Sequence, residues 1–203
     1  MNKTTLATCL LIILALLVSV RWATNTSAVN APPQDILSTP DTSLAVALSV
    51  ADMVNQSDVI AIGSCVETKS IWVDRSLVTL ATVSVSENLK GADASTITVA
   101  LPGGVDANRK IPVAMTYPGA PQIQPGENVF LFLTSASEVP GSYTVAGFSQ
   151  GKFSIVTDED GEQVVSRDLT KTSLQGNNGV RRGQTNLLPL ATFKDQVKGY
   201  LKQ

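Results

Sequence analysis

The chain has 203 residues and no histidine, and this absence alone excludes several classes of function. Without histidine there is no Ser-His-Asp triad, Cys-His dyad, HExxH zinc site or histidine-ligated haem. Two cysteines are too few for a four-cysteine zinc site or a disulfide scaffold. Aromatic residues make up only 5% of the chain, which leaves too few rings to stack nucleic-acid bases along a basic groove. We therefore expect a protein that is not an enzyme, holds no cofactor or metal ion and binds no nucleic acid.

The first 28 residues are typical of a secretory signal peptide. Lys3 precedes an unbroken apolar run from Cys9 to Val18, and small residues follow up to Ala28, where we expect cleavage. The alternative is an uncleaved anchor helix, but the whole apolar region 6–20 is shorter than the roughly 20 residues that cross a bilayer. We predict a secreted chain, extracellular or in the periplasm or cell envelope, with no stable membrane span after cleavage.

Cleavage would leave Cys65 as the single cysteine, so the mature domain would contain no internal disulfide. Cys65 lies in the apolar run 59–66, and with no histidine to activate it we expect a buried, unreactive strand residue.

Charge is distributed unevenly along the mature chain. Residues 31–168 contain 7 basic and 16 acidic residues, whereas residues 169–203 contain 6 basic and 1 acidic residue. The sequence therefore indicates an acidic body with a basic tail.

Periodicity predicts a short helical region and then a β-rich body. Residues 29–42 are rich in proline and small polar residues and predict an extended linker. Apolar residues at spacings of three and four predict a helix over 43–56. Short β-rich runs bounded by turn residues follow at 59–66, 76–86, 96–101, 129–133, 143–147, 152–156 and 163–166.

The predicted fold class is mainly all-β, a small OB-like closed β-barrel with a preceding helix and a C-terminal amphipathic helix. Closure of a barrel would protect the edges of so many short strands without disulfides. The barrel domain with its N-terminal helix is expected at 43–168, a polar linker at 169–188 and the C-terminal helix at 189–203.

The segment 102–127 interrupts the β pattern and is our candidate partner-binding loop. It contains five prolines and four glycines over a length that is unusual for a loop without a function. The residues that we single out as binding candidates are Gly103, Gly104, Tyr117, Pro118 and Gly119.

The segment Gly147–Gly151 matches the GxSxG pattern of a nucleophile elbow centred on Ser149. An elbow requires a strand-to-helix turn and a base, whereas here β-like sequence lies on both sides and histidine is absent. Lys152 as a partner base would need a helix to align it. We predict a strand–turn–strand with glycines at the turn.

Two charged segments have simple structural interpretations. The acidic run 158–162 lacks the closing glutamate of a calcium loop and is expected to be a solvated hairpin tip. Lys194, Lys198 and Lys202 form a stripe on the C-terminal helix, where cations complement the helix dipole. The alternative is that this stripe, together with Arg181 and Arg182, makes a weak contact with an anionic membrane or cell-wall polymer.

Three segments together resemble the netrin-like module, which includes the N-terminal domains of tissue metalloproteinase inhibitors. They are the entry Ser57-Asp58-Val59-Ile60 to a first strand, the exit Leu89-Lys90-Gly91 from a second, and the later run 125–133. The resemblance covers roughly residues 44–168 and extends to exported bacterial proteins of unknown role. It implies an OB-like, five-stranded closed barrel flanked by helices. The inhibitors chelate zinc through an N-terminal cysteine, and the expected mature start near Val29 has none, so only the fold is expected to carry over.

The function that we predict is an exported, non-enzymatic binding or accessory module. Its partner would be an extracellular or cell-surface protein gripped by the loop 102–127. The alternative is an exported protease inhibitor that presents Tyr117-Pro118-Gly119-Ala120 to the enzyme as a substrate-like loop.

Overall fold

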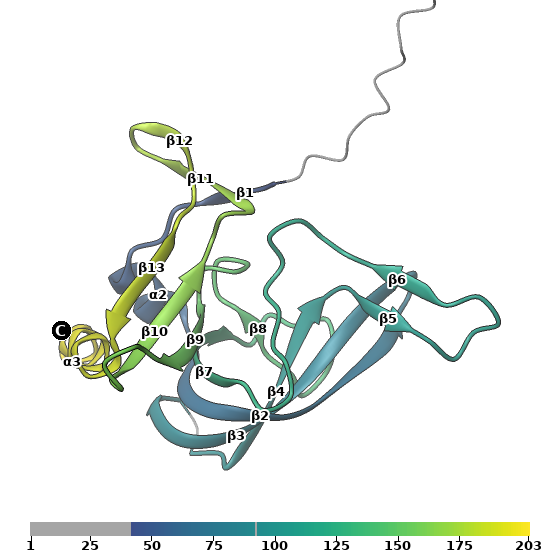
Figure 1. Ribbon diagram of the computed structural model, residues 1–203, viewed down its shortest axis with the longest axis horizontal. Helices are drawn as coiled ribbons and strands as arrows, with labels where there is room; N and C mark the ends of the chain where they lie inside the picture. The colour runs from purple at the N-terminus through teal and green to yellow at the C-terminus, as the bar shows by residue number, and fades with distance from the viewer. Residues whose placement is uncertain (1–41, 92) are drawn as a thin grey trace, which may run out of the picture. The chain divides into compact units, whose positions relative to one another are not determined.

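The computed structural model of the chain describes residues 42–91 and 93–203 (Figure 1). These residues are mostly β-strand and contain two helices, which confirms the prediction of a mainly β protein. The predicted signal peptide, and the predicted linker up to residue 41, lie outside the described residues. Within the described part of the chain, neither helix is long and apolar enough to cross a membrane.

The largest sheet is a continuous antiparallel path of seven strands with an eighth joined at its side. Its order is β13 (Thr185–Pro189), β10 (Gln163–Asp168), β9 (Lys152–Thr157), β7 (Asn128–Thr134), β2 (Val59–Val73), β3 (Ser76–Lys90) and β4 (Thr96–Pro102), and β8 (Thr144–Val145) pairs with β7. The path is open, and none of the sheets among the described residues closes into the barrel that the sequence predicts.

Two smaller sheets complete the β structure. One contains β1 (Ser43–Val46), β11 (Thr172–Gly176) and β12 (Gly179–Arg182), with β1 parallel to β11; the other is the hairpin of β5 (Gly104–Asp106) and β6 (Val113–Met115). The segment 169–188, predicted as a polar linker, therefore contains β11, β12 and most of β13. Gly176 and Gly179 close a tight turn between β11 and β12, and pairing with β1 buries Thr172 and Leu174. The sequence did not indicate these strands because the segment is polar, and only every second residue of β11 is buried, so the apolar signal of a strand is weak.

The N-terminal helix is shorter than predicted. Residues 43–46 form β1, and α2 (Val50–Gln56) begins only after Ser49. The Ser49 side chain accepts a hydrogen bond from the Asp52 amide, while the Asp52 carboxylate accepts one from the Ser49 amide. This capping box fixes the start of the helix. The preceding residues instead pair with β11, and this tertiary pairing overrides their weak helical spacing.

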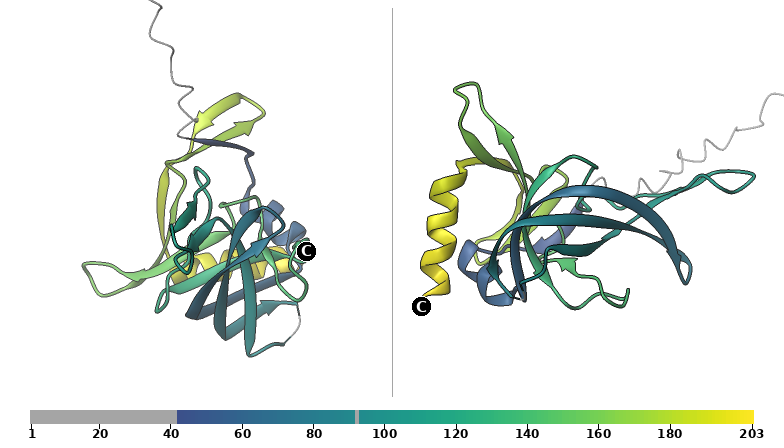
Figure 2. Two further views of the ribbon diagram at one scale, coloured as in Figure 1. Left: turned by 90° about the vertical axis from the view of Figure 1, so that its right-hand side faces the viewer. Right: turned by 90° about the horizontal axis from the view of Figure 1, so that it is seen from below.

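The long hairpin of β2 and β3 is bent by irregularities in its register. Shifts occur between Ile60 and Ala61, between Ile62 and Gly63, and between Cys65 and Glu67. A Cβ at Gly63 would lie 2.3 Å from the Ser84 carbonyl oxygen, so only glycine allows the two strands to approach there. Such bulges increase the local twist and bend the strands. β2 pairs with β7 only over Val59–Ser64, and beyond that its far half curves outward together with β3 (Figure 2).

Two buried clusters lie on opposite faces of β2 and β7, because side chains alternate along a strand. The aliphatic cluster contains Val59, Ala61, Cys65, Ala81, Val83, Ile97, Val99, Leu101, Ile123, Val129, Leu131, Leu133 and Val145. The aromatic cluster contains Met53, Val54, Ile60, Ile62, Phe130, Phe132, Ala146, Phe153, Ile155, Val165, Phe193 and Val197. The second cluster packs the sheet against α2 and against α3 (Leu190–Leu201), whose buried residues Phe193 and Val197 confirm the predicted amphipathic helix (Figure 2).

Candidate functional site

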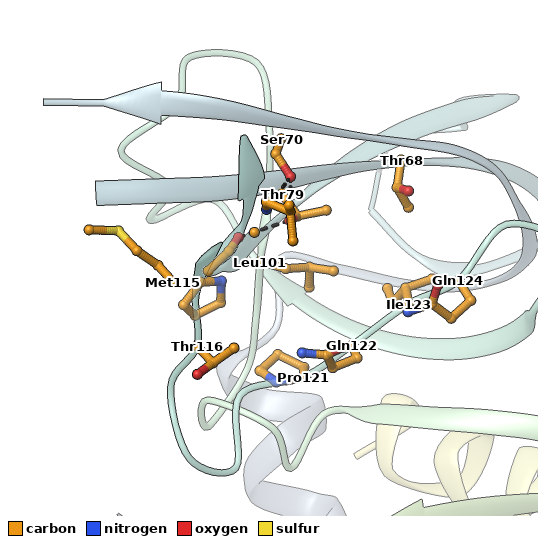
Figure 3. A pocket seen from close by; sticks show the side chains of 14 residues that line it. Thr68, Ser70, Thr79, Leu101, Met115, Thr116, Pro121, Gln122, Ile123 and Gln124 are labelled. Atoms are coloured by element: carbon orange, nitrogen blue, oxygen red, sulfur yellow. Dashed lines mark hydrogen bonds between the residues drawn. The ribbon is translucent and has the colours of Figure 1, made fainter. Parts of the chain in front are cut away.

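A cleft of about 250 Å³ opens between the β2–β3 hairpin and the segment 102–127 (Figure 3). Its walls come from the outer halves of β2 and β3, the end of β4, the start of β5, the end of β6 and the chain that leads to β7. The lining residues are Thr68, Ser70, Thr79, Leu101, Pro102, Gly103, Gly104, Val105, Met115, Thr116, Pro121, Gln122, Ile123 and Gln124. The predicted loop therefore forms most of a concave surface, together with strands far away in the sequence.

The cleft is lined without any ionisable side chain. Hydroxyl groups on β2 and β3 face the residues near Pro121 and Gln122 across the opening (Figure 3). The rest of the lining is apolar or amide in character. A surface of this composition suits an uncharged ligand that offers both apolar groups and hydrogen-bonding groups.

A small hydroxyl network holds the segment 103–105 against the hairpin. The Thr79 hydroxyl donates to the Gly103 carbonyl at 2.8 Å, and the Val105 amide donates to Ser70 Oγ at 3.1 Å. Ser70 Oγ and Thr79 Oγ1 are themselves 3.3 Å apart. These bonds place the β5 backbone directly above the β2–β3 pair and define one wall of the cleft.

Gly103 and Gly104, two of the predicted candidates, line the cleft, and both have positive φ, 93° and 156°. A Cβ at position 103 would lie 2.6 Å from the Met115 carbonyl oxygen, and one at position 104 would lie 2.6 Å from Ser70 Oγ. Glycine is needed at both positions because of this close approach and this backbone conformation. The two predicted candidates therefore lie at positions in the cleft wall where the backbone requires glycine.

The other three predicted candidates lie outside the cleft lining. Tyr117, Pro118 and Gly119 belong to a tight turn in which the Ala120 amide donates to the Tyr117 carbonyl at 3.1 Å. Gly119 packs against the small sheet, since a Cβ there would lie 2.5 Å from Thr172 Oγ1. The structure thus separates the five candidates into two cleft residues and three turn residues.

Several lining residues were not singled out from the sequence, among them Ser70, Thr79, Met115 and Gln122. Ser70 and Thr79 come from two strands that are paired directly opposite each other. No local pattern marks them, because serine and threonine are common on the exposed side of a strand. Their role follows from the register of the hairpin and from the position of β5.

The far ends of the two hairpins are joined by a polar contact. Trp72 Nε1 donates to Asp106 Oδ2 at 2.8 Å, and Arg109 Nε donates to the same oxygen at 3.0 Å. The Arg109 guanidinium also lies over the Trp72 ring, 4.5 Å from its centroid. Hydrogen bonds from Trp72 above all, and from Arg109, hold the pKa of Asp106 below its usual range. The carboxylate therefore stays ionised and braces β5 against β2.

Ser149 of the GxSxG segment is buried, and its hydroxyl lies 3.3 Å from the Thr172 hydroxyl. The segment is a turn between β8 and β9, as predicted. Its most important side chain is Gln150, which accepts a hydrogen bond from the Leu48 amide at 2.8 Å and donates one to the Val46 carbonyl at 2.7 Å. The segment therefore fixes the N-terminal strand and presents no activated nucleophile.

The side chain of Lys152 interacts with Ser154, since Lys152 Nζ donates a hydrogen bond to Ser154 Oγ at 2.8 Å. Both groups also bind Glu127 Oε1, at 2.5 Å from Lys152 Nζ and 2.6 Å from Ser154 Oγ. Burial raises the pKa of Glu127, but the bonds from Lys152, from Ser154 and from the Gln124 amide more than offset this and lower it. Lys152 and Glu127 are paired with each other, and Ser154 joins them, so this cluster connects β9 to the start of β7.

Cys65 is buried in the aliphatic cluster. Burial raises the pKa of its thiol, and the nearby charge of Glu127 raises it further. The thiol is therefore protonated at neutral pH, which agrees with the predicted unreactive strand residue.

The two charged segments have structural contacts. Asp158 Oδ1 accepts hydrogen bonds from the Asp160 and Glu162 amides at 3.1 and 2.8 Å, so it shapes the tip of the β9–β10 hairpin. On α3, Lys194 pairs with Glu87, and Lys198 Nζ lies 3.3 Å from the same carboxylate. Hydrogen bonding to Lys194 is the main reason that the pKa of Glu87 is lowered. Most of the predicted lysine stripe therefore attaches α3 to β3.

Comparisons of the chain with models of protein families, with characterised proteins and with solved structures found no match.

Proposed function

We propose that this chain is an exported, non-enzymatic module that binds a protein partner through the cleft between the β2–β3 hairpin and the segment 102–127. The observation that carries the proposal is the uncharged lining of the cleft together with its hydroxyl and amide groups. Such a surface recognises an uncharged stretch of polypeptide, which offers apolar side chains and backbone hydrogen-bonding groups in alternation.

The size of the cleft favours an anchor from a larger partner. Sites that enclose a whole cofactor or drug-sized ligand usually measure about 300–1,000 Å³. A cleft of about 250 Å³ lies just below that range. It has room for one or two side chains of a partner whose remaining contacts lie outside it.

We also propose that the core of the fold is an OB-like barrel, as the resemblance to the netrin-like module implies. Its five strands would be β2, β3, β4, β8 and β7. Support comes from an isolated parallel bridge between Val99 of β4 and Tyr143, which immediately precedes β8. The Ala100 amide donates to the Tyr143 carbonyl at 2.7 Å, and the Tyr143 amide donates to the Thr98 carbonyl at 2.9 Å. Together with the β7–β8 pair, these bonds connect the two ends of the five-strand path.

A protease inhibitor is the weaker candidate. A substrate-like loop must present an extended backbone to the enzyme, whereas residues 117–120 form a closed turn. Gly119 is moreover packed against Thr172 and Ser43, which leaves one side of the turn inaccessible. The cleft remains the better candidate site.

The test is a variant that fills the cleft and leaves the rest of the surface unchanged. Gln122 is exposed at the cleft wall, so Gln122→Trp would place a large ring there without emptying the core. Gln175→Trp, at an exposed position on β11, is the matched control. Partner capture from extracellular extract, identified by mass spectrometry, should fall at least tenfold for Gln122→Trp and stay unchanged for Gln175→Trp. Equal capture by both variants would remove the cleft from the proposal.

A further inference from the structure

The basic residues of the acidic body are concentrated at one place. Residues 31–168 contain seven of them: Lys69, Arg75, Lys90, Arg109, Lys110, Lys152 and Arg167. Three are engaged elsewhere in the fold. Lys90 Nζ donates to the Val54 carbonyl, Lys152 pairs with Glu127, and Arg167 donates to the Gln150 carbonyl and lies over the Phe153 ring. The other four belong to the two projecting hairpins β2–β3 and β5–β6.

The ends of these hairpins form one structural unit. The outer part of the β2–β3 hairpin and the β5–β6 hairpin point in the same direction (Figures 1 and 2). The contacts of Asp106 with Trp72 and Arg109 hold them together. Arg75 lies at the turn of the first hairpin and Lys110 at the turn of the second, and both are exposed. We call Arg75, Arg109, Lys110 and Ile111 the hairpin tip.

The charge at this end is opposite to that of the body. The segments 69–75 and 105–112 contain four basic and two acidic residues, Asp74 and Asp106, so their net charge is +2. The remainder of residues 31–168 contains three basic and fourteen acidic residues, a net charge of −11. Within residues 31–168, a surface with a large negative charge is attracted by the tip and repelled by the remainder, so the tip is a second basic surface beside the C-terminal residues 169–203, whose net charge is +5.

An apolar side chain completes the tip. Ile111 follows Lys110 directly and is 76% exposed, the highest value among the large apolar residues of the described chain. Pro112, beside it, is also exposed. An exposed isoleucine next to exposed cations is costly in water but favourable at a lipid interface, where the apolar group enters the headgroup region and the cations meet the phosphates.

We propose that the hairpin tip is a docking surface for anionic phospholipid membranes. Arg75 and Lys110 would contact lipid phosphates, and Ile111 would enter the interface. Arg109 is a positioning residue, since its guanidinium is held by Asp106 and Trp72. This surface differs from the C-terminal lysine stripe, where Lys194 and Lys198 are paired with Glu87. It also lies outside the cleft lining apart from the shared base of the β5–β6 hairpin.

The test measures the preference of the full chain for charged vesicles. Flotation with vesicles of phosphatidylcholine alone, and of an equimolar mixture with phosphatidylglycerol, gives the ratio of bound protein in the two cases. Any binding by the apolar N-terminal segment is common to all variants, so the comparison of this ratio isolates the tip. We expect the natural chain to prefer the anionic vesicles by about 30-fold, since each cation near such a surface contributes roughly a fivefold factor. The preference should decline as salt is added.

The variant pairs separate lipid from other anions. Arg75→Gln with Lys110→Gln should remove most of this preference of about 30-fold, whereas Lys171→Gln, an exposed control, should change it little. Ile111→Ser should lower vesicle binding about fivefold, while Val180→Ser, an exposed control on β12, should not. If the natural chain shows no preference, or if Lys171→Gln reduces it equally, the proposal is wrong. It is also wrong if the charge variants lose binding but Ile111→Ser binds normally, because Ile111 would then not enter the lipid interface.

Discussion

The two faces of the central strands are packed in different ways, although they share the same backbone. The aliphatic cluster consists of small and branched side chains enclosed by bent strands. The aromatic cluster is built on four phenylalanines, and all six of their ring pairs have centroids within 6.5 Å. Strand curvature is thus matched to side-chain size: strongly bent strands leave little room between them, whereas a sheet covered by helices needs large rings to fill the gap.

The largest expected effect is on the aromatic face. Phe132→Ala removes a fully buried ring that contacts the other three, and we expect a loss of about 4 kcal/mol in the free energy of unfolding. Chemical denaturation measures the loss. Hydrogen exchange should show faster opening of α3, because Phe193 loses a partner. Phe132→Leu is the control and should lose clearly less. Unchanged exchange in α3 would mean that the cluster does not hold the helix.

The neighbouring residue tests the opposite face. Leu131→Ala empties part of the aliphatic cluster and should cost about 3 kcal/mol in the same measurement. Exchange in α3 should stay unchanged up to the global unfolding limit, while the β3 and β4 amides should open more easily. Leu131→Met is the volume-conserving control, with a cost below about 1.5 kcal/mol. Equal loosening of α3 by Leu131→Ala and Phe132→Ala would erase the distinction between the two faces.

The smallest of the three effects depends on pH. Glu127 has a pKa below its usual value in the folded chain, so its ionised form stabilises the fold above the unfolded pKa of about 4.3. That stabilisation is lost as the pH falls through the lower, folded pKa. We expect about 1.5 kcal/mol, since the carboxylate accepts three hydrogen bonds but is only partly buried. Denaturation from pH 7 to pH 3 should show a weaker pH dependence for Glu127→Gln than for the natural chain. If the free energy of unfolding depends on pH equally in both proteins, other groups cause the loss of stability in acid.

Local patterns in the sequence predicted most of the strands, and the reason is visible in their burial. The strands β4, β7, β9 and β10 lie where alternation or continuous apolar runs placed them. The long strands β2 and β3 continue beyond the predicted segments 59–66 and 76–86. The parts that were missed, 67–73 and 87–90, contain no buried residue and begin with the polar runs 67–70 and 87–88, so they lack the continuous apolar signal that marks a strand.

Long-range pairing accounts for what the sequence did not reveal. Residues 43–46 have apolar spacing that fits a helix equally well, and only β11, more than a hundred residues away, makes them a strand. The sequence likewise indicated only part of the candidate site, because some lining residues come together only through pairing of distant segments. Gly103 and Gly104 are marked locally by the glycine pair, whereas Ser70 and Thr79 reach the cleft only through the register of the hairpin.

The amide of Gln150 has a consequence for the behaviour of the chain at high concentration. By bonding to the Val46 carbonyl and the Leu48 amide, it satisfies backbone groups at the end of β1 that would otherwise invite a strand from another molecule. The Gln150 side chain thus makes the hydrogen bonds that a neighbouring strand would make, and we expect this to disfavour the pairing of another chain with that end of β1.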